Sequence, residues 1–208
     1  MINLETERRQ TVLVCPGFHP AALTEACLRS LHTVELATDQ WLVFPAERYP
    51  VYSGGHVLRF LHEQTGGRSP QAWLNQSVIF LGFSAGAVGA IAAAWGFHGL
   101  GGTVRAVFAV DGWGVPLGGP FPVHRLSHDR FTDWSAALLG SGGDRFYADP
   151  PVAHLDLWRS PHTAVGQWLE AQTGYTQPTT AAMFLQTWLS RYQSPSLDGG
   201  SAPRIANC

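Results

Sequence analysis

Short runs that read as strands alternate with stretches of helical periodicity, and this alternation constrains the chain more than any other feature. Six runs, most of them apolar, are predicted as strands at residues 11–15, 41–44, 77–81, 104–110, 122–127 and 145–148. Helices are predicted at residues 21–31, 55–64, 85–97, 132–139, 161–172 and 179–192. Apolar strands separated by helices are typical of an α/β protein, with a mostly parallel central sheet of about six strands and helices on both faces.

Length and composition are those of one globular domain. With 208 residues, of which 45% are hydrophobic, the chain can bury roughly 70% of the surface of its unfolded state. We therefore predict a single domain over residues 1–193. Residues 194–208 contain serine, proline and glycine without apolar periodicity, and we expect a flexible tail there.

The charged residues exclude several classes of function. They make up 13% of the chain and give a formal net charge of −2, so neither a nucleic-acid partner nor an anionic membrane surface is expected. All 13 basic residues are arginines. Without lysine, the chain cannot form the Schiff base of pyridoxal phosphate enzymes, a P-loop or kinase site, or a Ser-Lys dyad. No cofactor is predicted.

Cysteine usage and the amino terminus favour a cytoplasmic location. Cys15, Cys27 and Cys208 form no CxxC pair, so neither a disulfide framework nor a thiolate zinc site is expected. The first ten residues lack the apolar core of a signal peptide, and no apolar run reaches the ~18 residues of a membrane span. The sequence thus predicts a cytoplasmic protein without a membrane span, and leaves its oligomeric state open.

The segment Gly82-Phe83-Ser84-Ala85-Gly86 has the pattern G-x-S-x-G, directly after a predicted strand and before a predicted helix. A serine hydroxyl is a weak nucleophile and must be held toward a base, which a sharp strand-to-helix turn does. Flanking glycines let neighbouring backbone approach, and the start of the helix offers free N–H groups to an oxyanion. The alternative is an ordinary tight turn in which Ser84 only caps the helix. The position of the motif favours catalysis.

Between about residues 11 and 172 the chain resembles the α/β-hydrolase superfamily. Besides the serine motif, Val14-Cys15-Pro16-Gly17-Phe18-His19 is similar to the strand and loop that donate an oxyanion-hole amide in that family. The family often has His-Gly where this chain has Pro16-Gly17. The resemblance implies an α/β-hydrolase fold, with the backbone amides of Phe18 and Ala85 forming the oxyanion hole.

In that family the serine is followed along the chain by an acid and then by a histidine, and the position of His154 fits the histidine. It follows the last predicted strand, and a short apolar stretch and Pro161 come after it. His162 is the alternative base. A loop histidine without any function is the remaining interpretation of either residue.

Asp129 fits the position of the acid, because it follows the predicted strand at residues 122–127. Asp111, one strand earlier, is the alternative acid, and Asp133 is a weaker one. Strand-end aspartates also form turns and cap helices, so Asp129 is equally placed to cap the helix that begins near Thr132.

Metal and dinucleotide sites are not predicted. His124 and His128 are four residues apart with Asp129 adjacent, but no further ligand completes a metal site, so the pair is interpreted as structural or as a support for the acid. The glycines of residues 99–102 and 112–119 lack the G-x-G-x-x-G pattern of a dinucleotide-binding turn.

The loops at the carboxyl edge of the predicted sheet carry apolar residues that suit an acyl or aromatic group. Phe18 lies in the first of these loops, and the predicted pocket residues are Phe83, Trp113, Val115 and Leu117. Ordinary loop packing is the competing interpretation for each. About ten residues separate Asp111 from the next strand, so no large cap domain fits there.

Together these residues predict a serine hydrolase that cleaves a small-molecule carboxylic ester or thioester through an acyl-serine intermediate. Ser84 is the predicted nucleophile, His154 the base and Asp129 the acid. Two other functions stay open. One is a non-catalytic domain of the same fold that binds a small molecule or a protein, and the other is a lyase or acyltransferase that uses the same serine and histidine.

Overall fold

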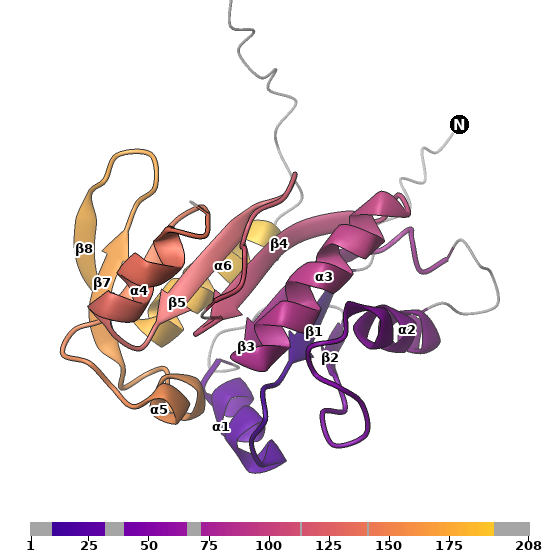
Figure 1. Ribbon diagram of the computed structural model, residues 1–208, viewed down its shortest axis with the longest axis horizontal. Coiled ribbons are helices and arrows are strands. Elements are labelled where there is room, and N and C mark those ends of the chain that lie inside the picture. Colours follow the sequence, from indigo (N-terminus) through magenta and orange to yellow (C-terminus); the bar gives the residue numbers. More distant parts are fainter. Residues whose placement is uncertain (1–9, 32–39, 66–71, 113, 141, 194–208) are drawn as a thin grey trace, which may run out of the picture.

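The computed structural model describes residues 10–31, 40–65, 72–112, 114–140 and 142–193, which form a central sheet flanked by helices (Figure 1). The strands are β1 (Gln10–Cys15), β2 (Gln40–Val43), β3 (Ser77–Phe83), β4 (Thr103–Val110), β5 (Val123–Ser127), β6 (Arg145–Ala148), β7 (Val165–Leu169) and β8 (Thr176–Thr180). The helices are α1 (Ala21–Leu31), α2 (Gly54–Thr65), α3 (Ala85–Gly99), α4 (Arg130–Ala137), α5 (His154–Arg159) and α6 (Ala181–Gln193). Residues 194–208, predicted as a tail, lie outside the described residues. Among the described residues, no helix combines the length and apolar character needed to cross a membrane.

The sheet has the strand order β2-β1-β3-β4-β5-β6-β7-β8. Strands β1 to β6 run parallel, whereas β7 and β8 are antiparallel to their neighbours. The chain passes from β1 to β2 on one side and returns to β3 on the other side of β1. This reversal makes a switch point between β1 and β3, and open α/β sheets bind ligands outside the carboxyl ends of the strands at such points.

Apolar side chains alternate between the two faces of the strands and build a separate core on each face. In β1, Val12 and Val14 pack on the side of α1, α5 and α6, while Leu13 and Cys15 pack on the side of α2 and α3. In Figure 1, α3 lies in front of the sheet and α6 behind it. With both faces covered, the parallel strands carry apolar residues throughout, which is why they read as continuous apolar runs in the sequence.

The α/β class and the mostly parallel sheet are confirmed, and the six predicted strands lie within two residues of their observed positions. The sheet has eight strands rather than about six, because it contains two strands that the sequence did not predict. One is β7, which lies inside residues 161–172 where a helix was predicted, and the other is β8. In β7, burial alternates with a period of two and places Trp168 in the core. Gly166 lies so close to the backbone of β6 that a Cβ there would collide with Tyr147. The predicted last helix is confirmed as α6.

His124 of β5 is buried beneath α6 in an aromatic cluster. Its ring lies 4.2 Å from that of Trp188 and 5.2 Å from that of Phe108, measured between centroids. Its Nδ1 lies 3.0 Å from the carbonyl oxygen of Asp144, and its Nε2 lies 2.7 Å from the hydroxyl of Tyr192. Burial lowers the pKa of His124 to about 4. The ring is therefore neutral, with Nδ1–H donating to Asp144 and Nε2 accepting from Tyr192.

This buried histidine makes stability depend on pH. Between the ordinary value of 6.5 and the lowered pKa of about 4, the unfolded chain takes up a proton that the folded protein does not. The contribution is therefore complete above about pH 6.5, and at pH 5 about 2 kcal/mol of it is lost. We expect His124→Gln, which keeps a donor and an acceptor but does not titrate, to lose correspondingly less free energy of unfolding between pH 7.5 and pH 5. Urea unfolding of both proteins measures this, and an equal loss in the two would contradict it.

Candidate active site

Ser84 stands on the turn between β3 and α3, at the switch point of the sheet. Its backbone has φ 52° and ψ −125°, a left-handed conformation that costs a non-glycine residue of order 1–3 kcal/mol. Its N–H donates to the carbonyl of Val110 in β4 over 2.8 Å, which ties the turn to the neighbouring strand. Although Ser84 occupies the N-cap position of α3, its side chain makes no capping hydrogen bond. The side chain therefore has no role as a helix cap.

Two glycines make this turn sterically feasible, because backbone packs against both. A Cβ on Gly82 would lie 2.6 Å from the Cα of Ala87, and one on Gly86 would collide with the carbonyl oxygens of Cys15 and Pro16. The first glycine thus lets α3 approach β3, and the second lets α3 approach the end of β1. Both glycines of the motif are required by close approach of backbone.

The loop after β1 reaches the same turn. A Cβ on Gly17 would lie 3.1 Å from the Cβ of Ser84. Phe18 follows Gly17 with its side chain 70% exposed and its ring 6.4 Å from that of Tyr52. Ala85 is the first residue of α3, where helical N–H groups lack partners within the helix. The two predicted amide donors, Phe18 and Ala85, thus belong to segments that meet at the serine.

Asp111 follows β4 and offers a buried carboxylate to the same edge. Its backbone is also left-handed, with φ 49°. Its Oδ2 lies 2.8 Å from His154 Nδ1 and 3.0 Å from His128 Nδ1, and its Oδ1 accepts from the backbone N–H of His128 over 2.8 Å. The side chain is only 1% exposed. The carboxylate is thus removed from solvent and satisfied by hydrogen bonds from two histidines.

His154 is the first residue of α5, and its ring lies beside the serine turn. It stacks on Phe83, the residue before Ser84, with ring centroids 4.7 Å apart and planes 24° apart. Because Nδ1–H donates to Asp111, Nε2 of the neutral ring is the nitrogen that accepts a proton. The side chain is 42% exposed, so the ring is open to solvent. Ser84, Asp111 and His154 thus come to one edge of the sheet from three different strand ends.

The structure brings His154 to Asp111, the alternative acid, and not to Asp129. Asp129 is the N-cap of α4, where its Oδ1 accepts from the backbone N–H of Thr132 over 2.6 Å. Its other oxygen lies 3.4 Å from His128 Nε2. Partial burial raises its pKa, but the hydrogen bonds from Thr132 and the nearby His128 outweigh this, so the pKa is lowered. The predicted acid, Asp129, follows β5, whereas the carboxylate that contacts His154 is that of Asp111, which follows β4.

The remaining alternatives lie elsewhere. Asp133 is buried on α4 with its Oδ2 3.0 Å from Arg145 Nε, and burial raises its pKa against the effect of nearby arginines. His162 lies in the turn after α5 with an exposed side chain. Burial raises the pKa of the Cys15 thiol at the end of β1, which leaves it without thiolate character.

The predicted pocket residues are packed into the protein. Phe83 lies between the rings of His154 and Trp158, with centroids 4.7 and 5.0 Å away. Val115 and Leu117 belong to the core beside α3. Trp113 lies outside the described residues. Of the described predicted residues, Leu117 lines the small cavity beside Asp111, whereas Phe83 and Val115 pack in the core.

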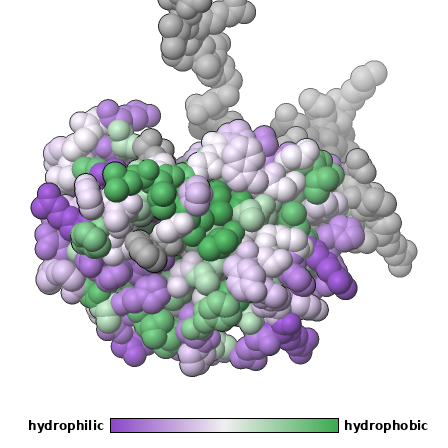
Figure 2. Space-filling model, viewed as in Figure 1, coloured by the Kyte–Doolittle hydropathy of each residue, from purple (hydrophilic) through white to green (hydrophobic). Residues whose placement is uncertain are grey.

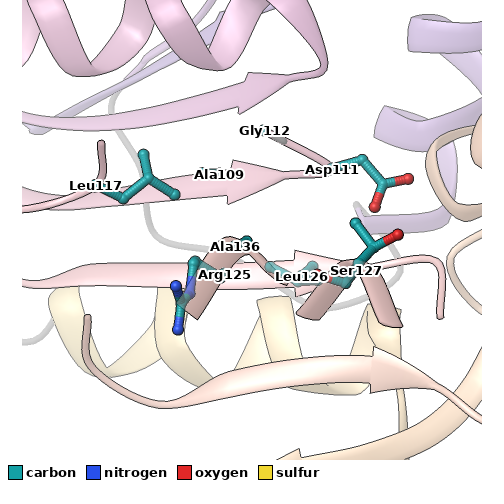
Figure 3. Close-up of a pocket in the computed structure, with 9 residues that line it drawn as sticks. Ala109, Asp111, Gly112, Leu117, Arg125, Leu126, Ser127 and Ala136 are labelled. Atoms are coloured by element: carbon teal, nitrogen blue, oxygen red, sulfur yellow. The ribbon is translucent and has the colours of Figure 1, made fainter. Parts of the chain in front are cut away.

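A small cavity lies next to Asp111, with room for about one water molecule (Figure 3). It is lined by Asp111, Arg125, Ser127 and the apolar side chains around them. Arg125 is 2% exposed and donates from Nη1 to the carbonyl of Gly140 over 2.7 Å, while its Nε and Nη2 have no partner among the described residues. Burial lowers the pKa of this guanidinium. Its orphaned donors suit a buried water molecule or a small anion.

Within the described residues, the one group of side chains arranged to hold a metal ion is Asp111, His128 and His154, whose ligand atoms lie within 4.8 Å of one another. Two imidazoles and a carboxylate are suitable ligands for zinc. Asp111 Oδ2 already lies within hydrogen-bond distance of both Nδ1 atoms, so an ion bound through these three atoms would displace both Nδ1 protons. His124 is not part of this group, because it lies beneath α6, whereas His128 contacts Asp111.

Comparison with known proteins adds no assignment to this geometry. No protein-family model matches the chain, and no curated protein matches it significantly. The function must therefore be inferred from the site itself.

Two residues at this edge of the sheet were not singled out from the sequence. No role was predicted for Arg125, and His128 was interpreted only as structural or as a support for the acid. For Arg125 the available signal was a charged residue at an inward-facing position of a predicted strand.

The close packing at Gly86 has a measurable consequence for stability. We expect Gly86→Ala to lower the free energy of unfolding by about 1–3 kcal/mol, because the new Cβ would overlap the backbone at the end of β1. The matched control is Gly99→Ala at the other end of α3, where nothing lies within 4 Å. This variant should be neutral or slightly more stable. Urea unfolding of the three proteins tests the contrast, and equal stability of the two variants would refute it.

Proposed function

We propose that this chain is a serine hydrolase of the α/β-hydrolase superfamily that cleaves carboxylic esters or thioesters. Ser84 is the nucleophile, His154 the general base and Asp111 the acid that orients it. These residues keep the chain order serine, acid, histidine, and they follow β3, β4 and β6 of the parallel sheet. Asp111 takes the role that the sequence predicted for Asp129.

The hydrogen bond between His154 and the buried Asp111 is the observation that carries this proposal. A histidine alone beside a serine is common, whereas one whose Nδ1–H is fixed by a carboxylate presents Nε2 as a base. This histidine stacks on Phe83, the residue before a serine whose backbone is held in a strained turn. Strain of this kind accumulates at functional sites because the surrounding structure enforces it.

In the acylation step, the Ser84 hydroxyl gives its proton to Nε2 of His154 while Oγ bonds to the carbonyl carbon of the substrate. The backbone amides of Phe18 and Ala85 donate to the oxyanion of the tetrahedral intermediate. His154 then passes the proton from Nε2 to the leaving alkoxide or thiolate as the carbon–oxygen or carbon–sulfur bond breaks. Asp111 stays ionised and stabilises the imidazolium.

In the deacylation step, water replaces the alcohol or thiol. His154 accepts a proton from the water, whose oxygen attacks the acyl carbon, and returns the proton to Ser84 Oγ as the acyl-serine bond breaks. The product is a carboxylic acid. The exposed face of His154 gives water access to the base.

Exposed apolar side chains near the site favour an apolar acyl or aromatic group. Phe131 of α4, a helix that begins just after Asp129, is 69% exposed, and Leu138, the C-cap at the other end of that helix, is 70% exposed. Phe18 is exposed to a similar degree beside the serine turn. Figure 2 shows hydrophobic residues gathered in the part of the molecule where α4 lies in Figure 1. Such surfaces contact apolar groups more readily than charged ones.

Labelling with a fluorophosphonate, followed by intact-mass spectrometry, tests the nucleophile and the base. We expect one label on the wild type, none on Ser84→Ala, and labelling about 10²–10⁴-fold slower on His154→Ala because the proton acceptor is lost. His162→Ala should label at the wild-type rate. A panel of p-nitrophenyl esters of increasing chain length would then define the acyl group. A folded wild type that takes no label would favour the non-catalytic binding domain instead.

The same assay distinguishes the two acids. Asp111→Asn should slow labelling by about 10²-fold or more, because the amide does not stabilise the imidazolium or enforce its tautomer. Asp129→Asn keeps a capping side chain and should slow labelling less than about tenfold. Thermal unfolding of both variants checks that they are folded. The reverse order of effects would return the acid to Asp129.

A further inference from the structure

Among the described residues, one histidine supplies two of the three hydrogen bonds that the Asp111 carboxylate accepts. His128 donates from its backbone N–H to Oδ1 over 2.8 Å, and its Nδ1 lies 3.0 Å from Oδ2. The third bond, to His154, also falls on Oδ2. His128 therefore contacts both oxygens of the carboxylate, whereas His154 contacts one.

This two-point contact restricts rotation of the carboxylate. A carboxyl group held at one oxygen can turn about its Cβ–Cγ bond, since that torsion has broad minima. Bonds to both oxygens from one residue fix the plane of the group. With the plane fixed, Oδ2 keeps its direction toward His154 Nδ1.

His128 also holds the loop that carries His154. Its carbonyl oxygen accepts from the N–H of Val152 over 3.0 Å, two residues before His154. The acid and the loop of the base are thus both bonded to the same residue at the end of β5. A change in the position of His128 would therefore disturb both Asp111 and the loop that carries His154.

On its far side the ring of His128 faces a second carboxylate. Its Nε2 lies 3.4 Å from Asp129 Oδ2, and Asp129 is fixed as the cap of α4. The titratable groups facing the ring are thus Asp111, Asp129 and His154, whose ring centroid is 6.0 Å away. Nδ1–H is present both in the neutral tautomer that donates to Asp111 and in the imidazolium, so the contact with Asp111 survives protonation of Nε2.

Building on the hydrolase function above, we propose that His128 is a positioning residue for the acid. Its backbone N–H and its Nδ1–H hold the Asp111 carboxylate in the plane in which Oδ2 meets His154, and its carbonyl holds the loop of His154 in register. His128 touches neither the substrate nor the serine in this role. It acts through Asp111.

Two substitutions separate positioning from a general structural role. His128→Ala removes the side-chain donor, whereas His128→Asn replaces Nδ1–H by an amide N–H at nearly the same place and does not titrate. We expect fluorophosphonate labelling to slow by about 10–100-fold in His128→Ala and to recover to within about fivefold of the wild type in His128→Asn.

A second readout does not depend on activity. In protein labelled with ¹⁵N-histidine, the Nδ1–H of His154 should give a downfield proton signal from its bond to Asp111. This signal should persist in His128→Asn and shift upfield or broaden in His128→Ala. Thermal unfolding confirms that each variant is folded.

The outcomes are distinguishable. If the wild type takes no label, the hydrolase function fails, and the His154 signal alone decides whether His128 positions Asp111. If the wild type is labelled and His128→Ala keeps both its labelling rate and the His154 signal, the positioning role is overturned. Equal slowing in the alanine and asparagine variants would also overturn it, since the donor would then not be what matters.

Discussion

The parallel direction of β1 to β6 is the constraint on which the site depends. It brings the carboxyl ends of these strands to one edge, so residues far apart in the chain meet there without any long loop. Ser84 follows β3, Asp111 follows β4, His128 follows β5, and His154 follows β6 after a short loop. The helices only return the chain to the start of the next strand. The residues of the candidate site are therefore confined to the connections after the strands, while the cores on both faces make those connections rigid.

Two residues at this edge have unfavourable backbone conformations, and the surrounding packing has to offset their free-energy cost. Ser84 and Asp111 both hold left-handed backbone conformations, although neither is glycine. Each is anchored by a main-chain hydrogen bond to the neighbouring strand, from Ser84 to Val110 and from Asp111 to Leu126. The next strand in the sheet thus enforces the strain of the one before it. This dependence explains why two unfavourable conformations persist in successive connections.

Much of the fold was predictable because its signals are local. Apolar runs buried on both faces identify parallel strands, and the G-x-S-x-G motif identifies the turn at Ser84. β7 was missed because a five-residue strand with one buried tryptophan resembles part of an amphipathic helix. The choice between Asp111 and Asp129 was not local. Both follow strands, and only the sheet geometry decides which carboxylate turns toward His154 and which caps α4.

The antiparallel hairpin of β7 and β8 also determines how the sheet ends. An open sheet presents unpaired N–H and C=O groups at its outer strands, and another chain can add to them. Here β8 forms one edge, and Pro178 interrupts its row of donors because proline has no N–H. At the other edge β2 is only four residues long. Both margins are therefore poor templates for further strand pairing, which protects an apolar, tightly packed sheet from growing into aggregates.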